Sequence, residues 1–359
     1  MSAARQAGTE VVPANPRQLE DWRQRILPSP EEIRPGVWSV AVPFDLTPIR
    51  FTYCYILAAD GGAIVIDPGW DSNEGWDAIR EVLHTVQLAP EQPLVQGVVV
   101  THFHPDHLGM AQRLRDATGA WVGLHVEDEL LLRRLDTGEL SAAAADWQAS
   151  VGMPETVRAK FTFSPEMLAF RPNADDITKT LHGNEVFGTL AGDLRTMHTP
   201  GHTSGHLSLV LPDASLIFTG DHILPRISPS LDFGSRRDGD PLADYFVSLR
   251  ACAALGDLEV APAHEYRFLG LTRRVRDLIE HHQERCDEVE AAFSPGRSTW
   301  DIASAISWSR PWETLDAFNL RSALTETECH LVYLAARGRI DWKRPDPMPG
   351  SNLDERHAS

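Results

Sequence analysis

The feature that most constrains this chain is a segment in which three histidines and one aspartate fall within six residues, 102–107, directly after an apolar stretch. In an extended chain, residues two apart share a face, so His102 and His104 should point the same way from the end of a strand. A proline then ends the extended run, and Asp106 and His107 follow at an expected helix start, where both side chains can turn back toward the same point. The segment therefore predicts His102 and His104 at one metal ion and Asp106 and His107 at a second.

The alternative to a metal site is a polar loop with solvated histidines. This alternative is less favoured if other segments supply further ligands. Three later segments each place one such residue at or just beyond the end of an expected strand: His202 after 194–198, Asp221 after 216–218 and His264 after 258–261. A two-metal centre needs additional His and carboxylate ligands of this kind at one edge of the fold.

Four motifs of this chain, HFHPDH at 102–107, HTPGHTSGH at 198–206, TGD at 219–221 and PAHE at 262–265, resemble the metallo-β-lactamase superfamily. The resemblance is greatest to its hydroxyacylglutathione hydrolase-like and lactonase-like branches, and it spans about residues 36–268. It implies an α/β fold, the αββα sandwich of two sheets with helices outside. It also implies a first metal held by His102, His104 and His202, a second held by Asp106, His107 and His264, and Asp221 as the bridge.

Several neighbouring side chains could be mistaken for ligands. His125, His198, His206 and His222 are expected to be buried or hydrogen-bonded instead. His222 could also orient Asp221 or contact substrate. Asp67, in the motif IVIDPG, is expected to accept the outer ring N–H of a ligating histidine.

Arg226 follows the expected bridging aspartate by five residues and should lie at the rim of the site. Its planar guanidinium pairs well with a carboxylate or phosphate, so it is a candidate for orienting an anionic part of the substrate. An ion pair on the surface is an equally good interpretation.

Composition limits the partners and the compartment. The chain has 359 residues, and 33 basic against 51 acidic side chains give a net charge of −18, which disfavours nucleic acid as a partner. The four cysteines are scattered without C-x-x-C spacing, as reduced core thiols would be. No apolar signal core is present, and no stretch approaches the roughly 18 apolar residues of a membrane span. We therefore expect a cytoplasmic protein without membrane contact; a homodimer is left open.

The chain divides into five expected parts. Residues 1–35 form an arm punctuated by prolines, 36–268 the metallo-β-lactamase-like domain, 129–182 a helical insertion within it, 269–342 a mainly helical C-terminal domain and 343–359 a loose tail. In the main domain, strands are expected near 37–42, 53–58, 63–66 and 97–101, and a helix at 76–86.

The insertion is a candidate cap over the metal site, because long segments of this kind are often functional lids. Its apolar and aromatic residues should then face inward, although ordinary helix packing is the alternative: Trp147, Met153, Phe161, Phe163, Met167 and Phe170. The C-terminal domain, with helices near 269–293, 299–308, 311–319 and 325–337 and a strand or wing at 338–342, resembles the winged-helix tail of some superfamily members.

Two divalent ions about 3.5 to 4 Å apart lower the pKa of a shared water, so a bridging hydroxide is the expected nucleophile. No G-x-S-x-G motif is present, which disfavours a serine nucleophile. Asp106 is the expected catalytic residue, because it can accept a proton and pass it to the leaving group. Zinc is the default metal, and iron or manganese would suit the same ligands.

The predicted function is hydrolysis of a carboxylic thioester, ester or lactone of a small molecule. The alternative is a metal-dependent endoribonuclease or phosphodiesterase with a winged-helix tail, which the acidic charge disfavours. A diiron oxygen- or NO-reducing protein lacks support because no flavin-binding domain follows, and a non-catalytic protein on this fold would be expected to have lost ligands.

Overall fold

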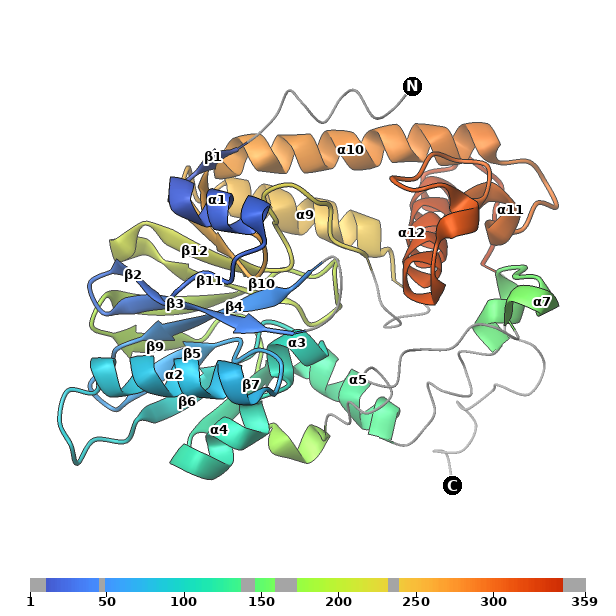
Figure 1. Cartoon of the computed structure of the whole chain (residues 1–359). Coiled ribbons are helices and arrows are strands. Elements are labelled where there is room, and N and C mark those ends of the chain that lie inside the picture. Colours follow the sequence, from blue (N-terminus) through green and yellow to red (C-terminus); the bar gives the residue numbers. More distant parts are fainter. Residues whose placement is uncertain (1–10, 45–48, 137–145, 159–172, 232–238, 345–359) are drawn as a thin grey trace.

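Two seven-stranded sheets lie face to face in the computed structural model, which describes residues 11–44, 49–136, 146–158, 173–231 and 239–344 (Figure 1). The first sheet has the strand order β1 (Val12–Pro13), β14 (Phe268–Leu269), β13 (Glu259–Pro262), β12 (Leu216–Gly220), β11 (Leu207–Leu211), β10 (Gly192–His198) and β9 (Val186–Thr189). The second has the order β2 (Glu31–Arg34), β3 (Val37–Pro43), β4 (Phe51–Leu57), β5 (Ala63–Ile66), β6 (Val95–Val99), β7 (Trp121–His125) and β8 (Lys179–Leu181).

Helices cover the outer face of each sheet. The second sheet packs against α2 (Asn73–Val86), α4 (Ala111–Thr118) and α5 (Val126–Asp136). The first packs against α9 (Pro241–Ala253), α10 (Leu271–Ala292) and α12 (Ala317–Ala336). The shorter helices are α1 (Pro16–Gln24), α3 (Pro105–Leu108), α7 (Glu155–Arg158) and α11 (Thr299–Ala303), with 3₁₀ turns at Ala174–Asp176, Pro212–Ala214 and Trp312–Thr314. The expected αββα sandwich is therefore confirmed.

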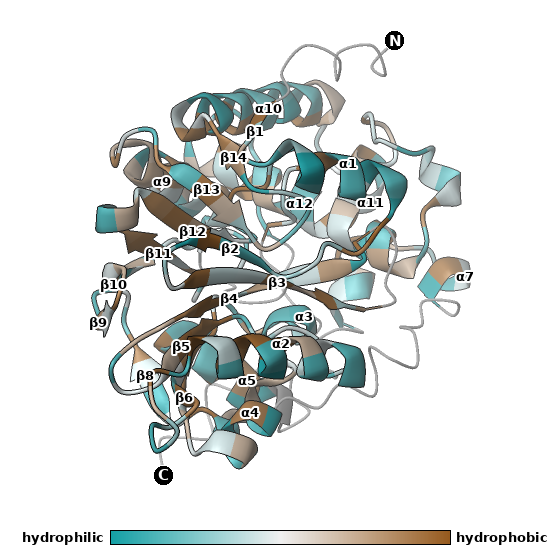
Figure 2. Ribbon diagram, turned by 60° about the vertical axis from the view of Figure 1, so that its left-hand side comes forward, coloured by the Kyte–Doolittle hydropathy of each residue, from teal (hydrophilic) through white to brown (hydrophobic). Residues whose placement is uncertain are grey.

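The central strands read as nearly continuous apolar runs because both of their faces are covered. Every residue of β4 and of β12 is buried. Between the sheets, Tyr55 of β4 meets Phe218 of β12 with ring centroids 4.9 Å apart. Figure 2 shows apolar residues concentrated along these strands and hydrophilic residues on the outward surface of α10. Burial of apolar area on both faces is the main stabilising contribution to a fold of this kind.

The helix expected to start at Asp106 is broken into α3 and α4. The break is caused by close contact with the turn that follows β5: the N–H of Met110 donates to Gly69 O at 2.9 Å, and the N–H of Gly69 donates to His107 O at 3.3 Å. A side chain on Gly109 would come within 2.4 Å of the carbonyl oxygen of Pro105, so only glycine fits at this point.

Residues 11–34 of the expected N-terminal arm are built into both sheets, so the boundary at residue 35 does not separate an arm from the body. β1 pairs with β14, and β2 pairs with β3. Both strands are short and carry little apolar alternation, which is why their sequence did not indicate them.

The expected insertion of 129–182 is also narrower than predicted. Its start lies within α5, and β8 at its end is the edge strand of the second sheet. Trp147 and Met153 pack with α11 and α12, where the indole N–H of Trp147 donates to Glu328 at 2.9 Å. Phe161, Phe163, Met167 and Phe170 lie outside the described residues.

Helices α10 and α12 share an apolar cluster with the first sheet, and the predicted wing at 338–342 is wrong. In place of a strand, α12 ends in a turn in which Gly338, with φ 67°, donates to Ala335 O and Arg339 donates to Leu334 O. Ile340 is buried in the apolar cluster under α10 instead of pairing with another strand. α12 therefore packs against α9 and α10, and α11 packs on α12.

The sequence also predicted reduced cysteines and no membrane-spanning segment. All four cysteines are buried and none forms a disulfide, as predicted. In the part of the chain that the structure describes, no helix is both long and apolar enough to cross a bilayer.

Candidate metal centre

The seven predicted ligands converge at one edge of the sandwich, from loops that follow four strands. The segment 102–108 follows β6 and runs into α3, and His202 lies on the loop between β10 and β11. Asp221 comes directly after β12 and His264 two residues after β13. Since β12 and β13 are parallel neighbours, their C-terminal ends bring Asp221 and His264 together.

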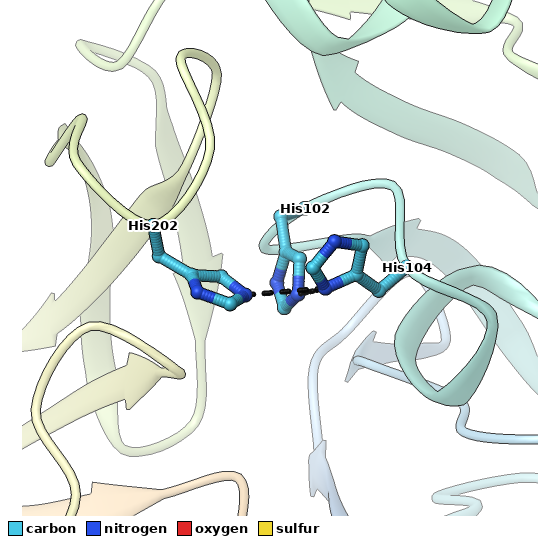
Figure 3. Close-up of side chains that lie close together, drawn as sticks. All are labelled: His102, His104 and His202. Carbon is cyan, nitrogen blue, oxygen red and sulfur yellow. Dashed lines mark hydrogen bonds between the residues drawn. The ribbon is translucent and has the colours of Figure 1, made fainter. Parts of the chain in front are cut away.

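Three imidazoles form the first group, and Figure 3 shows their ring nitrogens pointing toward one another. His104 Nδ1 lies 2.9 Å from His102 Nε2 and 3.1 Å from His202 Nε2. A tetrahedral ion with N–metal bonds of about 2.0–2.1 Å would hold these atoms roughly 3.3–3.4 Å apart, which the rings reach by moving apart by less than about 0.5 Å. The three atoms are thus arranged as one face of a four-coordinate site.

A second group lies on the other side of Asp221. His264 Nε2 lies 3.4 Å from Asp106 Oδ2 and 3.0 Å from Asp221 Oδ1, and His107 Nε2 lies 3.7 and 3.5 Å from the same two oxygens. The other oxygen of Asp221, Oδ2, faces His202 Nε2 at 3.7 Å. The two oxygens of one carboxylate therefore face two separate sets of ligands.

The atoms that face the second group are buried polar atoms without a hydrogen bond. Among the described residues, His107 Nε2, His264 Nε2 and Asp221 Oδ1 make no hydrogen bond of normal geometry. Leaving three such atoms unsatisfied would cost about 1–3 kcal/mol each. A divalent cation at this point satisfies all three, so the residues present fit the metal that the donor set implies.

The outer nitrogens of the same rings are anchored, which fixes the direction in which the inner ones point. His107 Nδ1 lies 2.8 Å from Asp67 Oδ2, His264 Nδ1 donates to Phe51 O at 3.0 Å, and His202 Nδ1 donates to Ser230 O at 2.6 Å. In each ring the anchored nitrogen carries the proton, so the inner nitrogen presents its lone pair to the centre.

At several ligands the local pKa shifts favour the protonation states that bind metal, whereas at His107 and His264 burial is outweighed by the carboxylates of Asp106 and Asp221, which raise the imidazole pKa. Burial, reinforced by the neighbouring imidazoles, lowers the pKa of His102 well below its usual value and that of His104 to about 3. Although burial opposes it, the imidazole of His107 together with His264 lowers the pKa of Asp106 to about 2. Burial likewise opposes ionisation of Asp221, yet His264 and His107 hold its pKa well below the usual range. These carboxylates are thus ionised, and the imidazoles of His102 and His104 neutral, near neutral pH.

Asp67 supports the metal-binding segment as predicted. It adopts the left-handed conformation with φ 48°, which is strained for a residue other than glycine. In that conformation Oδ1 accepts the N–H of Thr101 at 2.7 Å, while Oδ2 accepts the hydroxyl of Thr101 at 2.7 Å and contacts His107. Three contacts therefore offset the backbone strain.

Asp128, at the start of α5, is a supporting residue that the sequence analysis missed. Its Oδ2 accepts the N–H of Phe103 at 3.1 Å and the hydroxyl of Thr203 at 2.9 Å, and its Oδ1 accepts the N–H of Gly205 at 2.7 Å. Burial raises the pKa of Asp128 to about 7, and the three donors oppose that shift. One carboxylate thus ties the loop of His102 and His104 to the loop of His202. The only local signal is an aspartate at an expected helix start.

The other histidines near this segment make contacts of their own with neighbouring residues. His125 stacks on His198 with centroids 4.0 Å apart. His206 is buried, with Nδ1 2.9 Å from the hydroxyl of Thr199 and Nε2 accepting the N–H of Asp221 at 3.3 Å. His222 is fully buried with its ring against Tyr245, so we assign it no contact with substrate.

Arg226 is engaged with other side chains at the rim. Its guanidinium lies over the ring of Trp22, 4.1 Å from the centroid, and its Nη1 is 4.0 Å from Glu265 Oε1. This arrangement matches the interpretation of Arg226 as a partly exposed structural ion pair.

Aromatic side chains lie beside the second group of ligands. Phe44 packs edge-on against His264 with centroids 6.3 Å apart, and it stacks on Trp70 at 6.1 Å. The hydroxyl of Thr52 lies 3.5 Å from Asp106 Oδ2. The side of the centre that carries Asp106 is therefore bordered by apolar rings.

Comparison with known proteins shows which family this chain belongs to. The family model of the metallo-beta-lactamase superfamily matches residues 47–264, more than half of the chain, so the protein belongs to this superfamily.

Two solved structures share the fold over most of the chain. A metallo-beta-lactamase family protein from Thermus thermophilus has 25% identity and a TM-score of 0.68, covering 86% of this chain and 95% of that one. A beta-lactamase domain protein from Burkholderia ambifaria has 26% identity and a TM-score of 0.72, covering 86% and 89%.

The curated relatives are more distant. The lactamase-like protein adaB of Aspergillus niger is 23% identical over 253 residues, 70% of this chain and 61% of its own length. The atrochrysone carboxyl ACP thioesterase nsrC of Aspergillus novofumigatus is 23% identical over 242 residues, 66% of this chain and 56% of its own. The chain thus spans about three-fifths of the length of these two relatives.

Proposed function

We propose that this protein is a dinuclear metal-dependent hydrolase that cleaves a carboxylic thioester, ester or lactone of a small molecule. The observation that carries the proposal is the position of Asp221, whose two oxygens face two separate sets of ligands. The proposed first set is His102, His104 and His202, and the proposed second set is Asp106, His107 and His264. Zinc is the proposed metal.

When bound, two divalent ions would supply a water of lowered pKa and polarise the scissile carbonyl. The side chains of the protein are already in place around this site. Asp106 has the hydroxyl of Thr52 and the ring of His264 on one side of its carboxylate, and its low pKa keeps it ionised. It is placed to accept a proton and to return it to the leaving oxygen or sulfur. The anchored histidines keep their orientation throughout.

The apolar border formed by Phe44 and Trp70 supports an acyl group over a phosphodiester as the substrate. The similarity to a fungal acyl-carrier-protein thioesterase points the same way, although that relative is only 23% identical. The endoribonuclease alternative depended on a winged-helix tail, and residues 338–342 form no strand. The net charge of −18 also disfavours RNA.

A substrate panel tests this proposal. Protein reconstituted with zinc would be assayed against acyl thioesters, aryl esters, lactones and single-stranded RNA at low salt, beside the matched variants His104→Ala and His84→Ala. His84 is exposed on α2 and serves as the control. We expect hydrolysis of at least one carboxylic substrate that His104→Ala loses and His84→Ala keeps. Cleavage of RNA with no carboxylic activity would overturn the proposal.

A further inference from the structure

Three arginines surround Trp22 at the C-terminal end of α1, in a chain whose net charge is −18. Arg50 donates from Nη2 to Trp22 O at 3.0 Å, and the guanidinium of Arg226 lies 4.1 Å from the centroid of the Trp22 ring. Arg25 ends the helix, and its backbone N–H donates to the same carbonyl oxygen at 3.3 Å. We call Arg25, Arg50 and Arg226 the arginine cluster.

The positive charge of the arginine cluster is only partly balanced. Glu265 lies 4.0 Å from Arg226 Nη1, and among the described residues it is the one carboxylate within that distance of the cluster. Asp21 of the same helix faces Arg17 instead, at 3.8 Å. Two of the three guanidinium groups are therefore left without a carboxylate partner in the part of the chain that the structure describes.

These two guanidinium groups belong to Arg25 and Arg50, which also repel each other. Burial lowers the pKa of Arg50, and the charge of Arg25 adds to that shift. Capping of the helix accounts for a single hydrogen bond of the Arg50 side chain, whereas a guanidinium carries five N–H donors. Arg25 is exposed and has a left-handed φ of 61°, at a helix end where glycine is the usual residue. Helix capping alone thus leaves most of these donors free for a ligand.

The arginine cluster lies on the side of the metal centre that carries Asp106, where the leaving group would take up its proton. Phe44 borders that side, with its ring edge-on to His264 at 6.3 Å between centroids. The backbone N–H of Phe44 donates to Arg50 O at 3.0 Å, and the next carbonyl oxygen, that of Phe51, accepts His264 Nδ1 at 3.0 Å. Arg50 is therefore one residue from the anchor of a proposed metal ligand, and its side chain leads from there to the end of α1.

We infer that Arg25 and Arg50 bind a phosphate group at the far end of the leaving thiol, so that the substrate is a thioester of a phosphate-bearing thiol. This inference rests on the proposed thioester hydrolysis. Guanidinium groups bind phosphate oxygens through charge-assisted, often bidentate, hydrogen bonds. The stacked rings of Phe44 and Trp70 would contact the uncharged part of the thiol between the scissile bond and the phosphate. Arg226, which is already engaged, would keep Trp22 in place.

Two substrates with one acyl group test the inference in the zinc-reconstituted full chain. The acyl group is attached to coenzyme A, which carries phosphates, and to pantetheine, which has the same thiol arm without phosphate. The wild type is compared with Arg25→Gln, Arg50→Gln and the control Arg80→Gln, whose arginine is exposed on α2 and paired with Asp77. Circular dichroism checks the folding of each variant. Glutamine at position 50 keeps an N–H donor for the helix end, and the exposed Arg25 provides a second variant that should leave the fold intact.

We expect the wild type to have the higher kcat/KM on the coenzyme A thioester, through a lower KM. This preference over the pantetheine thioester should fall by about 3- to 10-fold in Arg25→Gln and in Arg50→Gln but not in Arg80→Gln. Added salt should also reduce the preference of the wild type.

Two other results would contradict the inference in different ways. A wild-type preference retained in folded Arg25→Gln and Arg50→Gln, or equal cleavage of both thioesters by the wild type, would overturn the phosphate site and leave the proposed hydrolase activity standing. Failure of the wild type to cleave either thioester would overturn thioester hydrolysis itself, and the inference with it.

Discussion

Asp128 accepts a hydrogen bond from the backbone N–H of Phe103 at 3.1 Å, and so fixes the residue that separates His102 from His104. The same oxygen accepts the hydroxyl of Thr203, the residue after His202. All three imidazoles of the first group therefore depend on one buried carboxylate that binds no metal itself. Their spacing is set by contacts between two loops that are about a hundred residues apart in the sequence.

The first prediction concerns Asp128→Asn. All three neighbours of this carboxylate are donors, so an amide must turn its NH₂ toward at least one of them. We expect a loss of about 2–4 kcal/mol in the free energy of unfolding and a roughly 10- to 100-fold weaker first metal. Chemical denaturation and zinc competition measure the two effects. The exposed Asp175→Asn is the control, and equal behaviour of both variants would refute the supporting role.

The second prediction concerns Asp106→Asn. The amide cannot accept a proton and is a poor ligand, so turnover should fall by about 10²-fold or more while the first metal is retained. Turnover on the best substrate from the panel and metal content are the measurements. Asp116→Asn, at an exposed position on α4, should behave as the wild type. Wild-type turnover in Asp106→Asn would remove this residue from the proton transfer.

The third prediction concerns Asp221→Ala. Its two oxygens face His202 on one side and His107 and His264 on the other, so its loss should weaken both metal positions together. We expect the rise in melting temperature on adding zinc to shrink strongly, since binding stabilises the folded state by mass action. Loss of only one equivalent, with the other held at unchanged affinity, would show that Asp221 is not a bridge.

The fourth prediction concerns acid stability and His125, whose ring stacks on His198 away from the centre. Burial, followed by the charges of His198 and His182, lowers the pKa of His125 to about 4, and Glu185 opposes this shift. In the unfolded chain the ring takes up its proton near pH 6.5, as an ordinary histidine does. Because the folded pKa is the lower one, the contribution is complete above pH 6.5 and is lost as the pH falls toward 4.

We expect His125 to account for roughly 1–2 kcal/mol of that loss, less than the full shift implies because of solvent screening. His125→Gln should therefore make the free energy of unfolding of the metal-free protein depend less steeply on pH between 6.5 and 4. The exposed His84→Gln provides the comparison. An unchanged slope in His125→Gln would show that the ring titrates normally in the folded state.

The sequence was most informative where the relevant spacing is local. The segment 102–107 carries its geometry in six residues, and the strands before His202, Asp221 and His264 are apolar enough to be recognised. Because strand ends meet at one edge of a sheet, the convergence of these residues could be predicted without coordinates.

What the sequence could not reveal depends on contacts between distant segments. Asp128 resembles any aspartate at a helix start, and its acceptor role exists only once two loops are brought together. β1 and β2 pair as edge strands although their residues show little alternation. The isoleucine and tryptophan of 338–342 suggested a strand, whereas the turn after α12 directs Ile340 into the core.

The most direct test of the central claim is the rate of thioester hydrolysis as a function of zinc bound to the metal-free protein. We predict negligible activity without metal, a rise that is complete when two zinc ions are bound per chain, and no such rise when Asp221 is replaced by alanine. Hydrolysis at full rate by the metal-free protein would contradict the account.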